Sequence, residues 1–365
     1  MYGSTDSRNG LECLKYNGGL MRVLIIKTTS LGDLIHTLPA LSDAKKAIPD
    51  IRFDWVVEEP FQEIPAWHPA VDRIIPVALR RWRKQGWHRV KLREPLQFLK
   101  ELRQQKYDAI IDAQGLFKSA MLTVLARGGK RIGLSWKSAR EPLASLFYQK
   151  RAVVPWGQHA VTRARALFAG GLGYSLPTSV ADYGIDVDRL SPISTTTPYF
   201  VFLHGTTWDT KHWPEVYWLE LAKLVSEAGF SLQLLWGNEI ERARAEKIAS
   251  GLPMATVIPK KLRLTEAAGV LAAARGIVTV DTGLGHLAAA LGVPSVGIFG
   301  PTDPKNSGTL GQRQSHLAAD FVCAPCYQRE CHYKGNKPVD PPCFANLTPA
   351  LVWRTLTQQI EGGLV

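Results

Sequence analysis

The residues best suited to do chemistry lie in the stretch Val278–Pro304, which combines a buried strand, a polar turn, an apolar helix and a second buried strand. The turn is Asp281–Gly283. A helix that begins after such a turn offers unpaired backbone N–H groups and the positive end of its dipole, and together these bind anions, most often phosphate. The stretch therefore predicts a nucleotide-diphosphate ligand beside Thr282 and Gly283.

A second candidate loop, HGTTWDTKHWP, follows the apolar run Tyr199–His204. Thr206 and Thr207 supply hydroxyl donors, and Lys211 supplies a point charge that suits a phosphate group. Because a polar loop after a strand also carries lysines with no ligand, an ordinary loop lysine remains an alternative for Lys211.

Two carboxylates, Glu239 and Glu241, follow the next strand, which ends at Trp236–Gly237. A carboxylate in this place can hold the hydroxyls of a ribose. Acidic residues are equally expected in the first turn of any helix, where they stabilise its dipole.

The first predicted strand leads into KTTSLGDLIHTLPAL, which holds a single glycine, Gly32, in place of the G-x-G-x-x-G of a dinucleotide site. A nicotinamide enzyme is therefore disfavoured. Asp33 stands at the start of the following helix. It is either an N-cap, which would contribute about 1 kcal/mol, or a general base that accepts a proton from an acceptor hydroxyl.

A basic cluster, RRWRK, lies in the first half of the chain, and further basic residues follow it. Arginine pairs with carboxylates and phosphates through two parallel hydrogen bonds, so such a cluster suits an anionic acceptor. Interleaved tryptophan also occurs in nucleic-acid binders, but no nucleic-acid fold pattern accompanies it here. The candidate acceptor residues are Arg80, Arg81, Arg83, Lys84, Lys118, Arg140, His159 and Arg163.

Four of the five cysteines, Cys323, Cys326, Cys331 and Cys343, fall within 21 residues. In a protein without a secretory signal this spacing suggests a metal site before a disulfide framework. Pro325 inside the first pair and the surrounding loop composition keep an unmetallated surface loop open as the alternative. The D-x-D of Asp186–Asp188 lies near the predicted linker, so a metal-dependent sugar-nucleotide site is unsupported.

The charge of the chain is uneven. Residues 21–190 hold 27 Lys and Arg against 16 Asp and Glu, whereas residues 191–365 hold 15 against 14. A basic half indicates an anionic partner, although a solvated basic surface is the simpler alternative. No apolar run is long enough to span a membrane. The first 20 residues lack the apolar core of a signal peptide, which favours a cytoplasmic protein with a disordered extension at 1–20.

Apolar runs alternate with segments of helical periodicity along both halves, which predicts parallel sheets joined by helical crossovers. Among them are a strand at Val23–Lys27 and one long helix at Asp33–Ile48. We expect a first Rossmann-like domain at 21–188, a linker at 189–198 and a second Rossmann-like domain at 199–365 that carries the cysteine-rich segment 323–343. Each is a doubly wound α/β domain, and two such domains place their ligand edges across a central cleft.

Seven motifs, taken in order, resemble the lipopolysaccharide heptosyltransferases, inverting GT-B enzymes of glycosyltransferase family nine, and within that family the type I enzymes. The motifs are MRVLIIKTTSLGDLIHTLPAL, FDWVVEE, IPVALRRWRK, YDAIIDAQGLFKSA, SAREPLASLFY, FLHGTTWDTKHWP and VTVDTGLGHLAAAL with GPTDP. They span Met21 to Pro304. The cysteine-rich segment after them looks more like the tails of type II and III relatives.

The resemblance implies roles for single residues. Asp33 would be the catalytic base, and Lys211 would hold the diphosphate as charge develops on it. Glu241 would bind the ribose, although Glu239 lies close enough to blur that assignment. Asp281 and His286 match the D-T-G-x-x-H signature. The implied donor-binding set is Thr206, Thr207, Lys211, Glu241, Asp281, Thr282, Gly283 and His286, and the basic residues above would bind the acceptor.

The implied reaction moves L-glycero-D-manno-heptose from ADP-heptose to a Kdo residue of Kdo2-lipid A, at the cytoplasmic face of the inner membrane. No cofactor is expected, nor a nucleic-acid partner, and the protein would contact the anionic membrane surface peripherally. Two alternatives stay open. One is type II transfer onto heptosyl-Kdo2-lipid A, which the RRWRK cluster disfavours; the other is a non-catalytic protein that binds sugar nucleotides or anionic surfaces.

Overall fold

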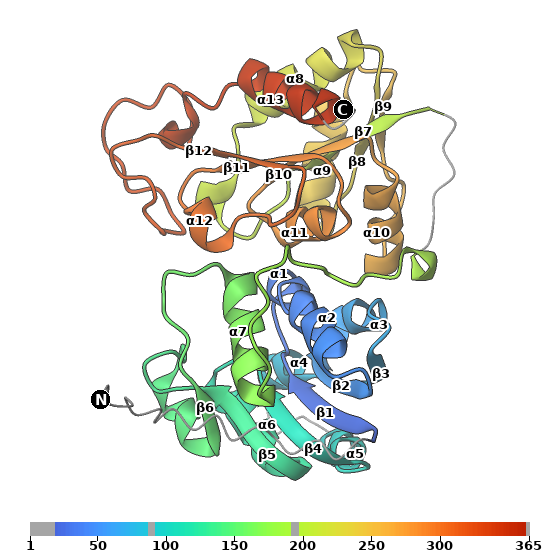
Figure 1. Ribbon diagram of the computed structural model, residues 1–365. Coiled ribbons are helices and arrows are strands. Elements are labelled where there is room, and N and C mark those ends of the chain that lie inside the picture. The colour runs from blue at the N-terminus through green and yellow to red at the C-terminus, as the bar shows by residue number, and fades with distance from the viewer. Residues whose placement is uncertain (1–18, 87–91, 191–196, 363–365) are drawn as a thin grey trace, which may run out of the picture. The chain divides into compact units, whose positions relative to one another are not determined.

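The computed structural model describes residues 19–86, 92–190 and 197–362 (Figure 1). Most of the predicted extension at 1–20, including Cys13, and most of the predicted linker at 189–198 lie outside these ranges. Contacts divide the chain into two compact units. Unit 1 holds the chain up to Thr29, Thr37–Trp156 and Val161–Gly184. Unit 2 holds Ser30–His36, Gly157–Ala160 and the chain from Ile185 onward.

Unit 1 is built on a six-stranded parallel sheet in the order β3-β2-β1-β4-β5-β6. The central strands consist of buried aliphatic residues, as expected for a parallel sheet covered on both faces. The strands are β1 (Met21–Ile26), β2 (Ile51–Glu58), β3 (Val71–Val77), β4 (Lys106–Asp112), β5 (Arg127–Leu134) and β6 (Lys150–Ala152).

Helices cover both faces of this sheet. A buried ion pair between Arg165 of α7 and Asp43 of α2 (2.6 Å) joins two of them. The helices are α2 (Leu38–Ala47), α3 (Glu63–Ala66), α4 (Leu79–Gln85), α5 (Arg93–Leu102), α6 (Phe117–Leu125) and α7 (Ala160–Leu172), with 3₁₀ turns η1 (Glu59–Phe61) and η3 (Pro142–Phe147). One apolar core contains Trp82 of α4, Phe98 of α5 and Leu122 of α6, so these three helices share a face of the sheet.

Unit 2 repeats this topology. Its sheet runs β12-β11-β10-β7-β8-β9, which is the same order when counted from the first strand of each unit. The strands are β7 (Tyr199–Leu203), β8 (Ser231–Leu234), β9 (Ala255–Val257), β10 (Gly276–Val280), β11 (Ser295–Phe299) and β12 (Gln314–Ala318). In such a sheet the ligand site lies where the strand order reverses, here between β7 and β10.

The helices of unit 2 are α1 (Leu31–Ile35), α8 (Glu215–Glu227), α9 (Glu239–Ala249), α10 (Leu264–Ala272), α11 (Gly283–Ala290), α12 (Pro304–Ser307) and α13 (Pro349–Glu361), with 3₁₀ turns η4 (Val187–Arg189), η5 (Asp209–Lys211) and η6 (Pro342–Phe344). In Figure 1, α13 lies beside α8. One apolar core contains Trp218 of α8, Leu356 of α13 and Phe344 of η6.

The predicted α/β class and the two parallel-sheet domains are confirmed. The prediction of one helix at Asp33–Ile48 was wrong, because the segment breaks into α1 and α2 at His36–Thr37. Pro39 falls in the first turn of α2, where its missing N–H costs nothing. Sequence reasoning also missed α4, which carries the basic cluster, and α7. Within the described residues, no helix is both long and apolar enough to cross a bilayer.

Candidate functional site

The candidate site of unit 2 lies at the carboxyl ends of β7 and β10. The loop His204–Lys211 follows β7, and the turn Asp281–Gly283 follows β10. Because these strands are hydrogen-bonded neighbours in parallel register, their ends meet at one edge of the sheet. The two loops singled out in the sequence therefore lie side by side.

An ion pair links these loops. Lys211 Nζ lies 2.7 Å from Asp281 Oδ2, and the two side chains are only 15% and 9% exposed. Thr302 Oγ1 donates to the same carboxylate oxygen (2.8 Å), and Thr206 Oγ1 donates to the Asp281 carbonyl (3.1 Å). A largely buried ammonium held in this way is a fixed positive charge at this edge of the sheet. Thr207, by contrast, is exposed.

Sequence reasoning missed a neighbouring aromatic. The ring of Trp208 lies 4.4 Å from Lys211 Nζ and 5.5 Å from the guanidinium carbon of Arg329. Arg329 comes from the cysteine-rich segment, whose backbone also receives hydrogen bonds from Thr210: its hydroxyl donates to the Gln328 carbonyl (2.6 Å) and its N–H to the Arg329 carbonyl (3.4 Å). The segment therefore packs on the loop His204–Lys211 and adds a second cation beside it. The motif W-x-x-K offered a signal for the tryptophan, but nothing in the spacing pointed to Arg329.

The turn after β10 is shaped by close packing. Thr282 is the N-cap of α11, and its side chain makes no capping hydrogen bond. A Cβ atom at Gly283 would lie 2.6 Å from a methyl carbon of Leu31, and one at Gly32 would lie 2.8 Å from the His286 ring. Both glycines are thus required for α1 and α11 to approach this closely.

Three histidines gather behind the turn. His36 Nε2 and His286 Nδ1 are 3.1 Å apart, and the ring centroids of His36 and His159 are 5.6 Å apart. His159 Nε2 also lies 2.9 Å from the carbonyl oxygen of Gly308. Burial lowers the pKa of His286 to about 4, and nearby Asp281 opposes this shift only in part. His286 is therefore neutral at neutral pH.

Asp33 belongs to the same group of residues. Asp33, Asp281, Lys211 and His159 all act electrostatically on the imidazole of His286. Asp33 is the third residue of α1 and forms a capping box: its Oδ2 accepts from Ser30 N and Ser30 Oγ, both at 2.9 Å. Ser30 is the N-cap, so an N-cap role for Asp33 was wrong. The box fixes the orientation of the carboxylate.

The two glutamates differ in place. Glu241 Oε2 accepts from Gly237 N–H (2.6 Å) and Glu241 Oε1 from Asn238 Nδ2 (2.9 Å). Its carboxyl group lies directly over Gly205 at the end of β7, where a Cβ atom would come within 2.7 Å. Glu239 is exposed and lies near Arg242 (3.8 Å). The geometry favours Glu241 as the residue at the ligand edge.

Seven of the eight predicted acceptor residues lie in unit 1, and the eighth, His159, lies in unit 2 among the histidines described above. The backbone N–H of Arg80 donates to the buried carboxyl of Glu58 (3.1 Å). Burial raises the pKa of that carboxyl, and the charges of Arg80 and Lys118 oppose the shift. Arg83, Lys84 and Arg140 are exposed. Sequence reasoning missed Glu58, which lies in the motif FDWVVEE.

Two other arginines are engaged by the protein itself. Arg81 pairs with Glu59 and Glu94, each at 2.9 Å. Arg163 stacks on Trp156 and donates to the Ser138 carbonyl (2.8 Å). Both side chains are held by contacts within unit 1, and a role in acceptor binding stays a prediction for both.

The cysteines lie in the segment that packs on the loop His204–Lys211. Burial raises the pKa of Cys343 to about 12 and that of Cys323 above its usual range, so these thiols are protonated at neutral pH. Among the described residues, no three His, Cys, Asp or Glu side chains are arranged to hold a metal ion. We therefore assign no metal to the cysteine-rich segment 323–343.

Comparison with known proteins places this arrangement in a family. The model of glycosyltransferase family 9 (heptosyltransferase) matches residues 96–337, which extends past Pro304, where the quoted motifs end. Lipopolysaccharide heptosyltransferase 1 of Pseudomonas aeruginosa is 55% identical over 341 residues, covering 91% of this chain and 96% of that protein. The protein of the same name from Escherichia coli K12 is 51% identical over 296 residues, covering 80% of this chain and 92% of that protein.

Solved structures agree with these matches. The E. coli heptosyltransferase WaaC with ADP is 45% identical, with a TM-score of 0.82, and the match covers 93% of this chain and all of that one. WaaC with ADP-2-deoxy-2-fluoro heptose is 51% identical, with a TM-score of 0.76 and coverage of 82% and 93%. This chain thus belongs to glycosyltransferase family 9, the heptosyltransferase family, and is a glycosyltransferase.

Proposed function

We propose that this chain transfers L-glycero-D-manno-heptose from ADP-heptose to a Kdo residue of Kdo2-lipid A, with inversion at the anomeric carbon. The observation that carries the proposal is the close packing of α1 on α11, in which Gly32 lies against the His286 ring and Leu31 against Gly283. This packing holds Asp33 of α1 near the start of α11 and the Lys211–Asp281 pair. Relatives named heptosyltransferase 1 at 51–55% identity support type I, since those named heptosyltransferase 2 are 24–27% identical.

In the proposed reaction, the Asp33 carboxylate takes the proton of the acceptor hydroxyl. That oxygen attacks the anomeric carbon from the face opposite ADP, and the bond to ADP breaks with its electron pair on the diphosphate. Lys211, Thr206 and the N–H groups at Thr282 and Gly283 stabilise the charge that develops there. Glu241 binds the ribose hydroxyls.

The acceptor is proposed to lie against unit 1. The basic residues Arg80 and Lys118 near Glu58, with exposed Arg83, Lys84 and Arg140, suit the carboxylates and phosphates of Kdo2-lipid A. Because the acceptor carries acyl chains, the enzyme must work at a membrane surface. We propose that this surface is the cytoplasmic face of the inner membrane and that the protein binds it peripherally. The proposed reaction needs no cofactor.

The test is to incubate the purified protein with ADP-heptose and, separately, Kdo2-lipid A and heptosyl-Kdo2-lipid A, and to analyse the products by mass spectrometry. We expect the mass of one heptose to be added to Kdo2-lipid A alone. Addition only to heptosyl-Kdo2-lipid A would assign the chain to type II. Absence of product from both acceptors, with retained ADP binding, would favour a non-catalytic binding protein.

A further inference from the structure

Helix α6 of unit 1 carries an apolar stripe on the side that faces solvent. Phe117, Met121, Val124 and Leu125 are exposed and follow the spacing i, i+4, i+7, i+8, which places them on one helical face. The opposite face, with Ser119, Ala120, Leu122 and Thr123, is buried. A surface helix ordinarily turns polar residues outward, so this outer stripe calls for a partner.

The neighbouring 3₁₀ helix extends the stripe. Leu143 and Leu146 of η3 are 56% and 62% exposed, and residues three apart on a 3₁₀ helix point the same way. The rings of Phe117 and Phe147 pack edge to face (5.4 Å), and Phe117 N–H donates to Glu141 (2.6 Å), so α6 and η3 form one surface. We call the exposed side chains of Phe117, Met121, Val124, Leu125, Leu143 and Leu146 the α6–η3 face.

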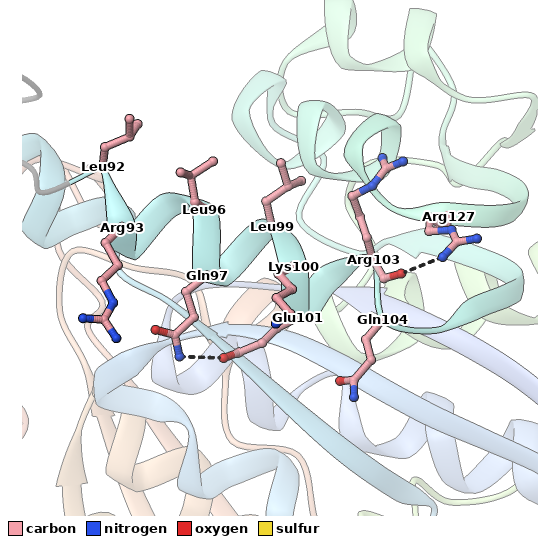
Figure 2. Close-up of a pocket in the computed structure, with 10 residues that line it drawn as sticks. All are labelled: Leu92, Arg93, Leu96, Gln97, Leu99, Lys100, Glu101, Arg103, Gln104 and Arg127. Atoms are coloured by element: carbon pink, nitrogen blue, oxygen red, sulfur yellow. Dashed lines mark hydrogen bonds between the residues drawn. The ribbon is translucent and has the colours of Figure 1, made fainter.

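Helix α5 adds leucines and cations at one end of this face. Arg103 Nη1 donates to the carbonyl of Leu125 (3.0 Å), which joins the end of α5 to the end of α6. Figure 2 shows Leu92, Leu96 and Leu99 on one side of α5, with Arg93 and Gln97 on the other. These leucines line an open groove of about 1220 Å³ that also contains Arg103 and Arg127.

The charge around the face identifies the partner. Residues 92–156 contain 12 Lys and Arg against five Asp and Glu. Apolar side chains in a basic surround fit an anionic lipid bilayer, in which the apolar groups enter the acyl region and the cations meet phosphate headgroups. A second copy of this chain would bring the same excess of positive charge against itself.

We propose that the α6–η3 face, with the leucines of α5, docks this enzyme on an anionic membrane surface. The proposal rests on the proposed function in that a lipid-linked acceptor is reached from such a surface. It assigns membrane contact to particular side chains, separate from the residues proposed to bind the acceptor sugars.

The test is co-sedimentation of the full-length protein with vesicles of phosphatidylcholine, with or without phosphatidylglycerol. Leu146→Glu and Met121→Glu each remove an apolar contact and add a negative charge. We expect each to lower the partition coefficient on the mixed vesicles by about tenfold. Val216→Glu, at a position on α8 with a matching exposed fraction of 61%, is the control and should bind as the wild type does.

All variants should keep wild-type thermal stability, because the altered side chains are exposed. They should also keep wild-type turnover on a deacylated, water-soluble acceptor. Wild-type vesicle binding by both variants, or equal binding to neutral vesicles, would overturn the docking proposal. The docking proposal would also be overturned if the wild-type protein sediments as a dimer in sedimentation velocity and both variants sediment as monomers. An inactive wild-type protein that still binds mixed vesicles would instead contradict the proposed function.

Discussion

The two units place an aspartate at the same point of the same topology and use it in opposite ways. Asp112 ends β4, and Asp281 follows β10, which is the equivalent strand of unit 2. Asp112 is fully buried and accepts from Tyr148 Oη (2.6 Å), Ser119 Oγ (2.8 Å) and two backbone N–H groups. These hydrogen bonds of the carboxylate therefore all stabilise the fold of unit 1. Asp281 instead orients Lys211 at the edge of its sheet.

The two halves of the chain also differ in net charge. Residues 21–190 carry a large excess of basic residues, whereas residues 191–365 are nearly neutral. A shared strand order therefore sets where a ligand can bind, and the side chains after the strands decide which ligand it is. The following variants test that division, beginning with the largest expected effect.

Replacing Asp33 by Asn should lower kcat about a thousandfold, because a general base contributes roughly 10² to 10⁴ in rate. The amide can still accept from Ser30, so α1 should persist. The transfer rate on Kdo2-lipid A and the ADP affinity by calorimetry, measured for the variant and the wild type, test this prediction. A weakened ADP affinity with unchanged turnover would move Asp33 from catalysis to the donor site.

Replacing Lys211 by Met should weaken ADP binding by roughly 10- to 100-fold and slow transfer, because a charge-assisted contact of about 1.5–3 kcal/mol is lost. It also leaves Asp281 without its cation, so the melting temperature should fall. Calorimetry and denaturation scans measure the two effects. Unchanged ADP affinity would remove Lys211 from the diphosphate site.

Replacing Gly205 by Ala should weaken ADP binding by about tenfold, since the new methyl group must displace the carboxyl of Glu241. Gly170→Ala in α7 is the control: its Cβ would meet only Ala152 at 3.8 Å, and a helical Ala gains about 0.5–1 kcal/mol of stability. Equal ADP affinity in the two variants would argue against Glu241 as a donor ligand.

Acidification should destabilise unit 2 before unit 1. Burial lowers the pKa of His286 and of His204 to about 4, against 6.5 unfolded, so the unfolded chain binds more protons. Stability is therefore lost as pH falls from 6.5 toward 4, by up to ~1.4 kcal/mol per pH unit for each histidine. In unit 1 burial raises the pKa of Asp54 and Asp112, and this contribution favours the folded state as pH falls.

Hydrogen exchange followed by mass spectrometry, corrected for intrinsic rates at each pH, reports the two units separately. Peptides of β7 and β10 should lose protection between pH 6.5 and 4 before those of β1 and β4. His286→Gln should reduce the slope for unit 2 alone. A parallel loss of protection in both units would contradict the assignment.

Much of this arrangement was predictable from local sequence. Apolar runs marked the strands, and the D-T-G turn and the H-G-T-T loop marked the ends of β10 and β7, because chain order and parallel pairing bring such ends together. The break at His36–Thr37 was hidden, since the apolar periodicity of α1 continues into α2. Arg329 was beyond prediction because it reaches Trp208 through a loop with no periodic pattern. Glu58 was overlooked because an acidic residue at the end of a strand ordinarily faces solvent.

The interleaving of the two units bears on how the protein can be dissected. The chain leaves unit 1 at Thr29 and returns at Thr37, so α1 is encoded far upstream of the rest of unit 2. A fragment beginning at Ile185 would lack Leu31 and Gly32, and the surfaces of Gly283 and His286 that they cover would be bare. Such a truncation should be poorly soluble, whereas supplying residues 19–48 as a separate peptide should restore part of its nucleotide affinity. Unit 2 is thus not encoded by one continuous stretch of chain, and a fragment that begins at Ile185 lacks α1.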